Sequence, residues 1–328
     1  MRAAHFAGDG RIEIVEAPEP QPGPGEVRVR VSACALCGSD LRPWRRGWPV
    51  TSGHEIAGEI DDLGHPRHGE RVIVYIPVFC GRCAECAAGQ THLCRESREL
   101  VGWQRPGGYA ERLAVPERCL LPVPDDVPHR LAPLLLDTIG TTAHGIRLAR
   151  RIVEPGPALV LGAGPIGLGA IIVLARMGFG PIHVVDPVSY RAAFAASLGA
   201  VETSPEQAAV GRFRLVVEAT GADAARQTAF EAVGPEGAIL QLGESDAWAI
   251  AETRSIRLKD FFLVRSFYFP IGSYGANLEL LRADRAKFER LIDATADLDG
   301  LGELFQSFAL GQKLKPIMSP IYSASVGP

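Results

Sequence analysis

The sequence contains no uninterrupted apolar run of the roughly 20 residues that a membrane-spanning helix needs. The best candidate, Ala158–Val173, is broken by glycines and a proline. The N-terminus reaches Gly8 without the apolar stretch of a secretory signal peptide. These two absences predict a protein that is not inserted in a membrane and that stays in the cytoplasm.

Blocks of basic residues are also absent, and the 328 residues carry a formal net charge of −4. The chain therefore has no electrostatic footprint for nucleic acid or for an anionic membrane surface. Apolar residues make up 47% and charged residues 22% of the chain, which excludes the disordered, collagen-like and fibrous classes. We expect a globular protein whose partners are small molecules.

A chain of 328 residues is long enough for two domains of typical size. Its first 130 or so residues are rich in proline, glycine and short runs in which apolar and polar residues alternate, which is typical of a β-rich domain. The alternating runs are Val27–Val31, Ile56–Ile60 and Arg71–Tyr75.

From about residue 137 the pattern changes to apolar strands, glycine turns and long helices. Strands that are apolar throughout predict a parallel sheet covered by helices on both faces. The predicted strands are Ala158–Leu161, Ile182–Val185, Leu215–Val217, Ala238–Leu242 and Phe261–Phe269. The predicted helices are Gly167–Met177, Tyr190–Leu198, Asn277–Arg282 and Arg285–Ala294, and a β-like segment, Lys315–Tyr322, closes the chain.

Four of the seven cysteines lie within fifteen residues, which favours metal binding over disulfides in a cytosolic chain. They follow the pattern C-x2-C-x2-C-x7-C, at Cys80, Cys83, Cys86 and Cys94. Four thiolates with this spacing can close a tetrahedron around Zn²⁺ and leave no position for a substrate. The pattern predicts a structural zinc site, whereas Cys34 and Cys119 are expected to be small buried apolar residues.

A glycine-rich GxGxxG segment lies between a predicted strand and a predicted helix. It runs through Gly162, Ala163, Gly164, Pro165, Ile166 and Gly167. Such glycines let the backbone approach a pyrophosphate, and the helix that follows offers free N–H groups to the anion. Asp186 ends the next strand 19 residues after Gly167, where a carboxylate accepts from ribose hydroxyls and repels a 2′-phosphate. The segment predicts a site for NAD rather than NADP, with Arg191 as a neighbour in the same site.

Three further pieces carry little information alone: Cys37-Gly38-Ser39-Asp40, Gly53-His54-Glu55, and Asp137. Together with the four-cysteine loop and the dinucleotide segment, their order along the chain resembles the zinc-dependent medium-chain alcohol and polyol dehydrogenases. The resemblance covers essentially the whole length. Gly107–Glu111, with the sequence G-G-Y-A-E, also resembles a segment of this family.

The resemblance implies a second, catalytic zinc, with Cys37 and His54 as its first two ligands. It leaves open whether Asp137 or the neighbouring Glu55 is the third. Asp137 falls where many alcohol dehydrogenases have a ligand cysteine and polyol dehydrogenases a glutamate, with His144 at the following family position. An acid at this place is closer to the polyol and sugar branch.

The resemblance also implies how the reaction proceeds. Ser39 matches the hydroxyl that takes the substrate proton, and Asp40 matches the carboxylate that orients the histidine ligand. Three protein ligands leave a fourth position, where Zn²⁺ acts as a Lewis acid and lowers the pKa of an alcohol. Hydride then passes to the nicotinamide, so the implied substrate is a secondary alcohol, a polyol or a sugar-like alcohol, or the carbonyl product in reverse.

Arg42 departs from the family, because it occupies the place where several relatives have a histidine that relays the proton. A guanidinium stays protonated at any working pH and cannot accept that proton. We therefore expect the relay to end in water or on another group, and Arg42 to contact the cofactor pyrophosphate or an anionic part of the substrate. The loop at 42–49 is either a solvated loop with aromatic anchors or a contact with a polar or anionic substrate.

The expected fold is α/β, with a GroES-like β-rich catalytic domain at 1–138 and 271–328 and a Rossmann domain, a doubly wound parallel sheet, at 139–270. Each chain is expected to hold two zinc ions and NAD, and to assemble into a homo-oligomer, a dimer or a tetramer. The alternative is a zinc-containing NAD-binding protein without turnover, in a sensor or structural role. A protein without turnover would not need Ser39 in addition to a full ligand set.

Overall fold

The computed structural model describes residues 1–245, 247–249 and 253–320. The chain forms two compact units. Unit 1 comprises Met1–Leu136, Pro270–Tyr274 and Glu289–Pro328, and unit 2 comprises Asp137–Phe269 and Gly275–Phe288. Within the described ranges, no helix is both long enough and apolar enough to cross a membrane.

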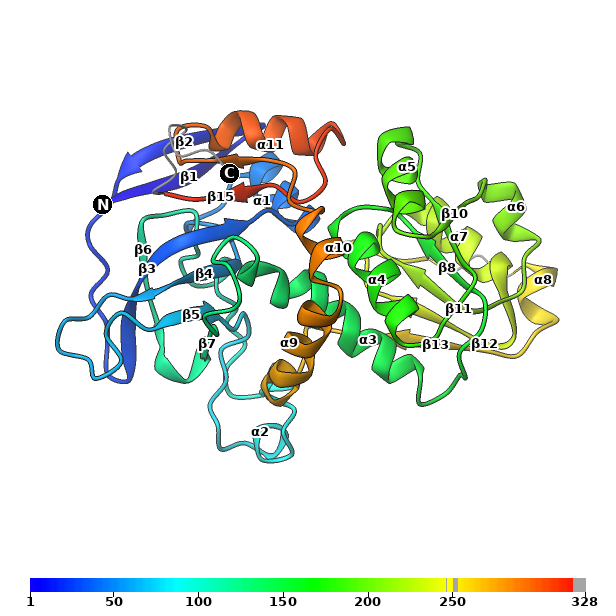
Figure 1. Ribbon diagram of the computed structural model, residues 1–328, viewed down its shortest axis with the longest axis horizontal. Helices are drawn as coiled ribbons and strands as arrows, with labels where there is room; N and C mark the ends of the chain where they lie inside the picture. Colours follow the sequence, from blue (N-terminus) through cyan, green and yellow to red (C-terminus); the bar gives the residue numbers. More distant parts are fainter. Residues whose placement is uncertain (246, 250–252, 321–328) are drawn as a thin grey trace. The chain divides into compact units, whose positions relative to one another are not determined.

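Unit 1 is built on a seven-stranded sheet, counted over the described residues, with the order β14-β15-β3-β4-β5-β7 and with β6 paired to β3 (Figure 1). Its strands are β3 (Glu26–Ala35), β4 (Glu55–Ile60), β5 (Arg71–Val74), β6 (Arg112–Pro116), β7 (Leu120–Pro122), β14 (Thr295–Ala296) and β15 (Ile317–Met318). A separate antiparallel pair consists of β1 (Arg2–Gly8) and β2 (Arg11–Glu16). The helices of this unit are α1 (Leu41–Arg46), α2 (Ala84–Ala87) and α11 (Leu301–Ala309).

The alternating pattern of unit 1 is confirmed by burial. In β3 the side chains of Val27, Val29 and Val31 are buried, whereas the residues between them are half-buried. The last three residues of β3 are all buried, because the strand pairs there with β4 on one edge and with β15 on the other. The end of β3 is therefore enclosed, and the chain leaves it directly into the candidate site.

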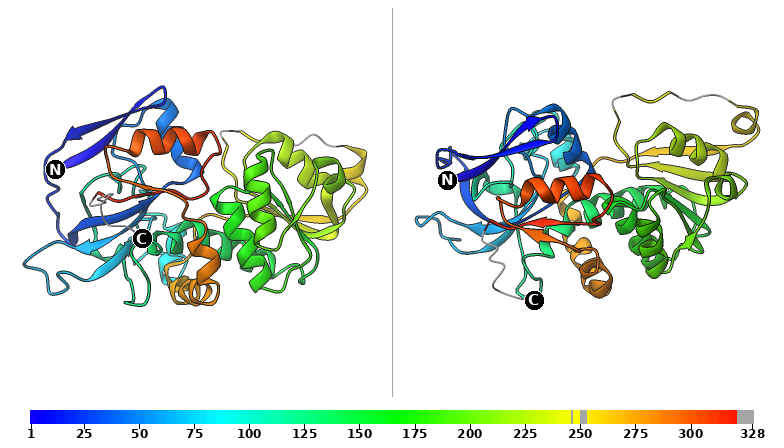
Figure 2. Two further views of the ribbon diagram at one scale, coloured as in Figure 1. Left: turned by 45° about the horizontal axis from the view of Figure 1, so that its top comes forward. Right: turned by 90° about the horizontal axis from the view of Figure 1, so that it is seen from above.

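Unit 2 has a parallel sheet with the order β10-β9-β8-β11-β12-β13, the doubly wound arrangement that the sequence predicted. Its strands are β8 (Ala158–Leu161), β9 (Ile182–Val185), β10 (Val201–Glu202), β11 (Phe213–Glu218), β12 (Val233–Gln241) and β13 (Phe261–Arg265). Helices cover both faces of this sheet (Figure 2). The helices that lie wholly or largely in unit 2 are α3 (Thr142–Ala149), α4 (Pro165–Arg176), α5 (Ser189–Ser197), α6 (Pro205–Ala209), α7 (Asp223–Ala232), α8 (Arg254–Arg257), α9 (Tyr274–Ala283) and α10 (Arg285–Glu289).

Several predicted bounds were too long. β13 ends at Arg265 rather than Phe269, because β12, with which it pairs, ends at Gln241. α10 ends at Glu289, after which Asp293 accepts hydrogen bonds from the backbone N–H groups of residues 314 and 315. The closing β-like segment is reduced to β15, and its residues 321 and 322 lie outside the described part of the chain.

Residues 275–288 also differ from the prediction, because the sequence analysis placed them, as part of 271–328, in the catalytic domain. They lie in unit 2. Arg147 of α3 donates a hydrogen bond to Asn277 at 3.2 Å, and Arg176 of α4 pairs with Asp284 at 2.7 Å. These contacts attach α9 and the first part of α10 to the helices of unit 2.

Candidate functional site

Four side chains bring potential metal-ligand atoms together, and all four are buried. Their thiol, imidazole and carboxylate atoms lie within 4.8 Å of one another, in Cys37, His54, Glu55 and Asp137. The first three belong to unit 1. Asp137 is joined to Leu136 of unit 1 by one peptide bond. We call this group the mixed cluster.

The sheet of unit 1 explains why two of these residues meet. Ala35 at the end of β3 is paired with Glu55 at the start of β4, so Cys37 and His54 lie at the same end of the two strands. Gly53 precedes the histidine with a φ of 95°, and a Cβ there would lie 2.8 Å from the sulfur of Cys34. Only glycine fits this turn.

Asp40 orients the histidine of the mixed cluster. Its Oδ1 lies 3.1 Å from Nδ1 of His54, while its Oδ2 accepts hydrogen bonds from the backbone N–H of Cys37 at 2.9 Å and from the hydroxyl of Tyr109 at 2.8 Å. Burial alone would raise the pKa of Asp40, but the charge and hydrogen bond of His54, aided by the other two donors, hold this pKa below its usual value. An ionised Asp40 places the imidazole proton on Nδ1, so Nε2 is the nitrogen suited to a metal.

Tyr109 is a contributor that the sequence did not single out. Burial and the negative charge of Asp40 raise the pKa of Tyr109 well above its usual value, so its hydroxyl remains a donor. The backbone of the G-G-Y segment runs along residues 51–53, with hydrogen bonds from Gly107, Gly108 and Tyr109 of 2.7, 2.8 and 3.0 Å. A buried tyrosine needs a hydrogen-bond partner for its hydroxyl. This general requirement is the one feature of the sequence that could have pointed to Tyr109.

A buried ion pair, also unforeseen, borders the mixed cluster. Nζ of Lys315 donates to Oε1 of Glu55 and to the backbone carbonyl of Leu36, the latter at 2.9 Å. Both charged side chains are fully buried, and 260 residues separate them in the sequence. One oxygen of Glu55 is thus engaged by a cation of the protein.

Asp137 begins a single turn of π-helix, Asp137–Thr141, a feature that is frequent at functional sites. Its Oδ1 accepts a hydrogen bond from the hydroxyl of Thr141 at 2.8 Å, which fixes the carboxylate. His144, at the next family position, lies buried on α3, and the cluster found among the described residues does not include it. Burial, with the charges of two nearby arginines, lowers its pKa to about 4.

Ser39 and Arg42 lie directly after the cysteine of the mixed cluster. Ser39 is half-buried on the 3₁₀ turn Gly38–Asp40, and Arg42 is half-buried in α1. The guanidinium carbon of Arg42 lies 4.7 Å from the centre of the Trp103 ring. That ring also lies against His54, with 5.5 Å between the ring centres.

The four cysteines of the predicted structural site form a second cluster, in which the sulfur atoms lie within 4.8 Å of one another. Backbone N–H groups point at these sulfur atoms: those of Cys80 and Ser97 at Cys94, and those of Arg82 and Cys83 at Cys80, over 3.3–3.4 Å. Burial raises the pKa of Cys94, but the backbone N–H groups of Ser97 and Cys80, together with other hydrogen bonds to this thiol, outweigh it and lower the pKa to about 6. Thiolates so supported suit a closed Zn²⁺ site.

The dinucleotide segment of unit 2 has the expected local geometry. Gly162 and Gly164 lead from β8 into α4, whose first residues are Pro165 and Ile166. A Cβ on Gly167 would lie 1.7 Å from the carbonyl oxygen of Gly162, so only glycine lets α4 pack this closely on the turn. The start of α4 therefore presents its N–H groups beside the end of β8.

Asp186 reinforces this turn from the end of β9. Its carboxylate accepts hydrogen bonds from the N–H of Ala163 at 2.6 Å and from that of Val188 at 2.8 Å. Each carboxylate oxygen keeps a second lone pair for a ligand hydroxyl. Arg191 lies half-buried on α5, five residues further along the chain.

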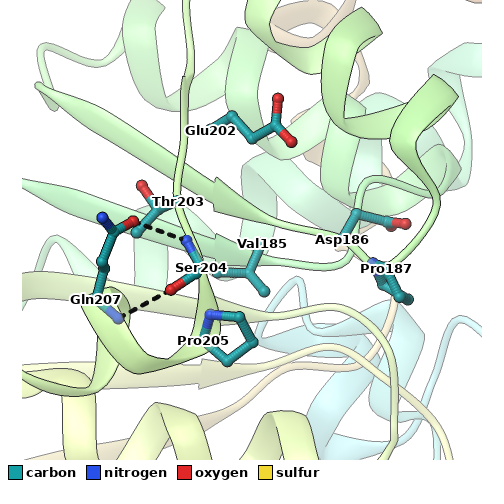
Figure 3. Close-up of a pocket in the computed structure, with 8 residues that line it drawn as sticks. All are labelled: Val185, Asp186, Pro187, Glu202, Thr203, Ser204, Pro205 and Gln207. Atoms are coloured by element: carbon teal, nitrogen blue, oxygen red, sulfur yellow. Dashed lines mark hydrogen bonds between the residues drawn. The ribbon is translucent and has the colours of Figure 1, made fainter.

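A pocket of about 380 Å³ opens beside Asp186, within the size range of small-molecule sites (Figure 3). Figure 3 shows that its walls come from the ends of β9 and β10 and from the start of α6. Two of its eight lining residues, Asp186 and Glu202, carry carboxylates, and none of the eight is basic. The pocket thus favours an uncharged group such as a base or a ribose over a phosphate.

Comparisons with known proteins place these features in a family. The family model for the alcohol dehydrogenase GroES-like domain matches residues 23–125, and that for the glucose dehydrogenase C-terminus matches residues 137–308. The L-threonine 3-dehydrogenase of Rhizobium rhizogenes is 34% identical over 317 residues, which cover 87% of this chain and 88% of the relative. The chain belongs to the medium-chain dehydrogenase family. It is an oxidoreductase of the alcohol dehydrogenase type.

Solved structures agree with this placement. The alcohol dehydrogenase of Thermus sp. ATN1 is 27% identical with a TM-score of 0.88, over 97% of this chain and 99% of that one. An alcohol dehydrogenase of Escherichia coli CFT073, solved with NADH, is 25% identical with a TM-score of 0.86, over the same shares of the two chains. The resemblance and the fold class predicted from the sequence of this dehydrogenase are thereby confirmed.

Tyr109→Phe in this dehydrogenase removes one donor from Asp40 and leaves the ring in place. We expect the affinity of the mixed cluster for zinc to fall about tenfold. This is the lower end of the range for losing a hydrogen-bond partner that supports a metal ligand. Chelator competition measures this affinity. Tyr274→Phe is the matched control, since it removes a hydroxyl hydrogen bond to the carbonyl of Pro122, away from the cluster. Equal zinc affinity in wild type and Tyr109→Phe would show that Asp40 does not need this donor.

Cys83→Ser and Cys37→Ser separate the two candidate metal sites. Cys83→Ser is expected to remove one zinc and to lower the melting temperature, because the cysteine loop loses its closed shell. Cys37→Ser is expected to remove one zinc and turnover, with little effect on melting. Elemental analysis and thermal unfolding test both. A single zinc per chain in the active wild-type protein contradicts the assignment.

Proposed function

We propose that this chain is a zinc-dependent, NAD(H)-linked dehydrogenase that interconverts a secondary alcohol, of the polyol or sugar-like class, and its carbonyl product. The observation that carries the proposal is the mixed cluster, with its thiol, imidazole and two carboxylates, directly beside Ser39. The dinucleotide turn with Asp186 supports the choice of cofactor.

The mixed cluster fits a divalent cation by its charges and donor types. Burial raises the pKa of the Cys37 thiol, and a bound cation would favour its thiolate form. Three buried carboxylates, those of Asp40, Glu55 and Asp137, lie in or beside the mixed cluster, and in the part of the chain that the structure describes Lys315 is the buried lysine paired there. Such an excess of buried negative charge is unfavourable without a counter-ion. Sulfur, nitrogen and oxygen ligands together suit Zn²⁺.

When bound, zinc supplies a Lewis acid that lowers the pKa of the substrate hydroxyl, and NAD accepts the hydride. The protein's own groups do the remaining work. Asp40 holds His54 in its ligating tautomer, and Tyr109 keeps Asp40 in place. The hydroxyl of Ser39 takes the substrate proton and passes it to water, because Arg42 stays protonated and cannot receive it.

A panel of secondary alcohols and polyols, followed by NADH absorbance, tests the proposed activity. Ser39→Ala is expected to lower kcat at least about a hundredfold, in the range for loss of a proton-transfer group, with zinc content unchanged. Normal turnover by Ser39→Ala would refute its role. Absence of turnover with every alcohol in zinc-loaded protein that binds NADH would favour the alternative, a binding protein without catalysis.

We propose Asp137 as the third ligand rather than Glu55, because Lys315 already engages one oxygen of Glu55. Asp137→Asn should lower zinc occupancy and kcat together. Lys315→Met should leave Glu55 as an uncompensated buried carboxylate and draw it to the metal. Cobalt substitution makes the ligand set visible in the absorption spectrum. A spectrum that changes in Lys315→Met and stays the same in Asp137→Asn would reverse the assignment.

Asp186 is proposed to set the preference for NAD. A 2′-phosphate would meet the carboxylates of Asp186 and Glu202 without a basic residue in the pocket wall. NAD is therefore expected to exceed NADP in kcat/KM by at least about a hundredfold, and Asp186→Ser to narrow this ratio about tenfold or more. Steady-state kinetics with both cofactors, in the wild type and in Asp186→Ser, measure this ratio. A wild-type preference for NADP would mean that Arg191 outweighs the two carboxylates.

The homo-oligomer expected from the family is also a proposal. Its support is β13, the strand at one edge of the described sheet of unit 2. The side chains of Phe262 and Leu263 in β13 are 46% and 43% exposed, and consecutive residues of a strand point to opposite faces of the sheet. Unpaired apolar edges favour pairing with another chain. Light scattering measures the assembly directly.

A further inference from the structure

We infer that Arg42 and Trp103 form a subsite for an anionic group of the substrate, a carboxylate or a phosphate, next to the catalytic metal. The inference rests on the proposed function and narrows its substrate class. It concerns residues of unit 1 alone, so it does not depend on how the two units are arranged.

The position of the guanidinium is the first argument. Arg42 lies on α1, three residues after Ser39, and its charged end lies over the face of Trp103 at 4.7 Å. His54 is a further neighbour of this ring, with ring centres 5.5 Å apart. One indole therefore separates the positive charge from a residue of the mixed cluster. The two distances bound the separation between the guanidinium carbon and the His54 ring centre at about 10 Å, which sets the span that a charged group of a substrate would have to cover.

The platform under the guanidinium is rigid. Trp48 donates its indole N–H to the backbone carbonyl of Trp103 at 2.8 Å and packs edge-on against the Trp103 ring. Trp103 is 6% exposed, so its ring is packed among neighbouring side chains. A guanidinium stacked on an aromatic face keeps its N–H groups in its own plane, where they can bind both oxygens of a carboxylate or phosphate.

Trp103 also offers a second donor. Its indole N–H is buried and has no hydrogen-bond partner among the described residues. Leaving a buried donor unsatisfied is costly, and such groups in native proteins call for an explanation. A bound anion that accepts from this N–H and from Arg42 provides one.

The three arginines of α1 differ in a way that supports a specific role for the first. Arg45 and Arg46 are exposed, whereas Arg42 is half-buried on the indole. A loop that served only for solubility would expose all three. This distinction selects the substrate-contact interpretation of residues 42–49 for Arg42 and leaves the exposed pair as solvated surface.

Two pairs of compounds test the inference, and in each pair one member carries a negative charge that the other lacks. The pairs are 3-hydroxybutyrate with 3-hydroxybutanamide, and sorbitol 6-phosphate with sorbitol. The first pair reports a carboxylate and the second a phosphate. Calorimetry of each compound with zinc- and NADH-loaded protein gives Kd apart from turnover, and NAD reduction gives KM and kcat.

In the wild type, we expect the charged member of at least one pair to bind at least about tenfold more tightly than its uncharged partner. This is the affinity gain typical of a hydrogen bond that involves a charged group. Arg42→Gln should abolish this preference by raising the Kd of the charged member, while the Kd of the uncharged member stays the same. Trp103→Phe keeps an aromatic ring and removes the N–H, and should weaken the charged member about threefold. Arg45→Gln, on the same helix and exposed, should change nothing.

Equal affinity within both pairs in the wild type overturns the subsite, whatever the turnover. A rise in KM for NAD in Arg42→Gln, with the substrate preference intact, overturns it in favour of a contact with the cofactor pyrophosphate. No turnover with any alcohol of the panel overturns the proposed function, whereas a preference in Kd would still support the subsite.

Discussion

The carboxylate of Asp40 is the constraint on which the candidate site depends. It ties the turn after β3, the histidine before β4 and the G-G-Y segment to one point, through contacts of 2.8–3.1 Å with Cys37, Tyr109 and His54. Because the carboxylate is fully buried, each partner must be present, or a charge is left unsatisfied in an apolar surrounding. The same interactions that hold His54 for a metal therefore also hold three loops of unit 1 together.

Local pattern was sufficient for the elements whose ends are set locally. β8 and β9 have the predicted bounds, because each is a short, mainly apolar run that stops at a glycine or an acid. β13 was predicted too long, since its end depends on where β12 ends. α11 was not predicted, although its buried residues, Leu301, Leu304, Phe305 and Phe308, follow a helical period.

The site divides in the same way. The two clusters could be predicted as sets of residue types, because ligand chemistry restricts which side chains occur. Lys315 could not, since a lysine is by default a solvated residue and its partner Glu55 lies 260 positions away. Tyr109 is 69 positions from Asp40, and nothing in the G-G-Y pattern states where its hydroxyl points. Long-range pairing of polar groups is a property of the packed unit, not of any short segment.

The two clusters differ in where their compensation comes from. In the cysteine cluster, N–H groups of Cys80, Arg82, Cys83 and Ser97 donate to the thiolates, so the loop that supplies the ligands also offsets their charge. In the mixed cluster the compensation comes from distant side chains, Lys315 and, through Asp40, Tyr109. A self-contained loop keeps its metal as long as the loop is folded. The mixed cluster instead keeps its ligand geometry only while β3, β4, the G-G-Y segment and the C-terminal segment are packed together. Local loosening of unit 1 is therefore expected to release a metal held by the mixed cluster before one held by the cysteine cluster.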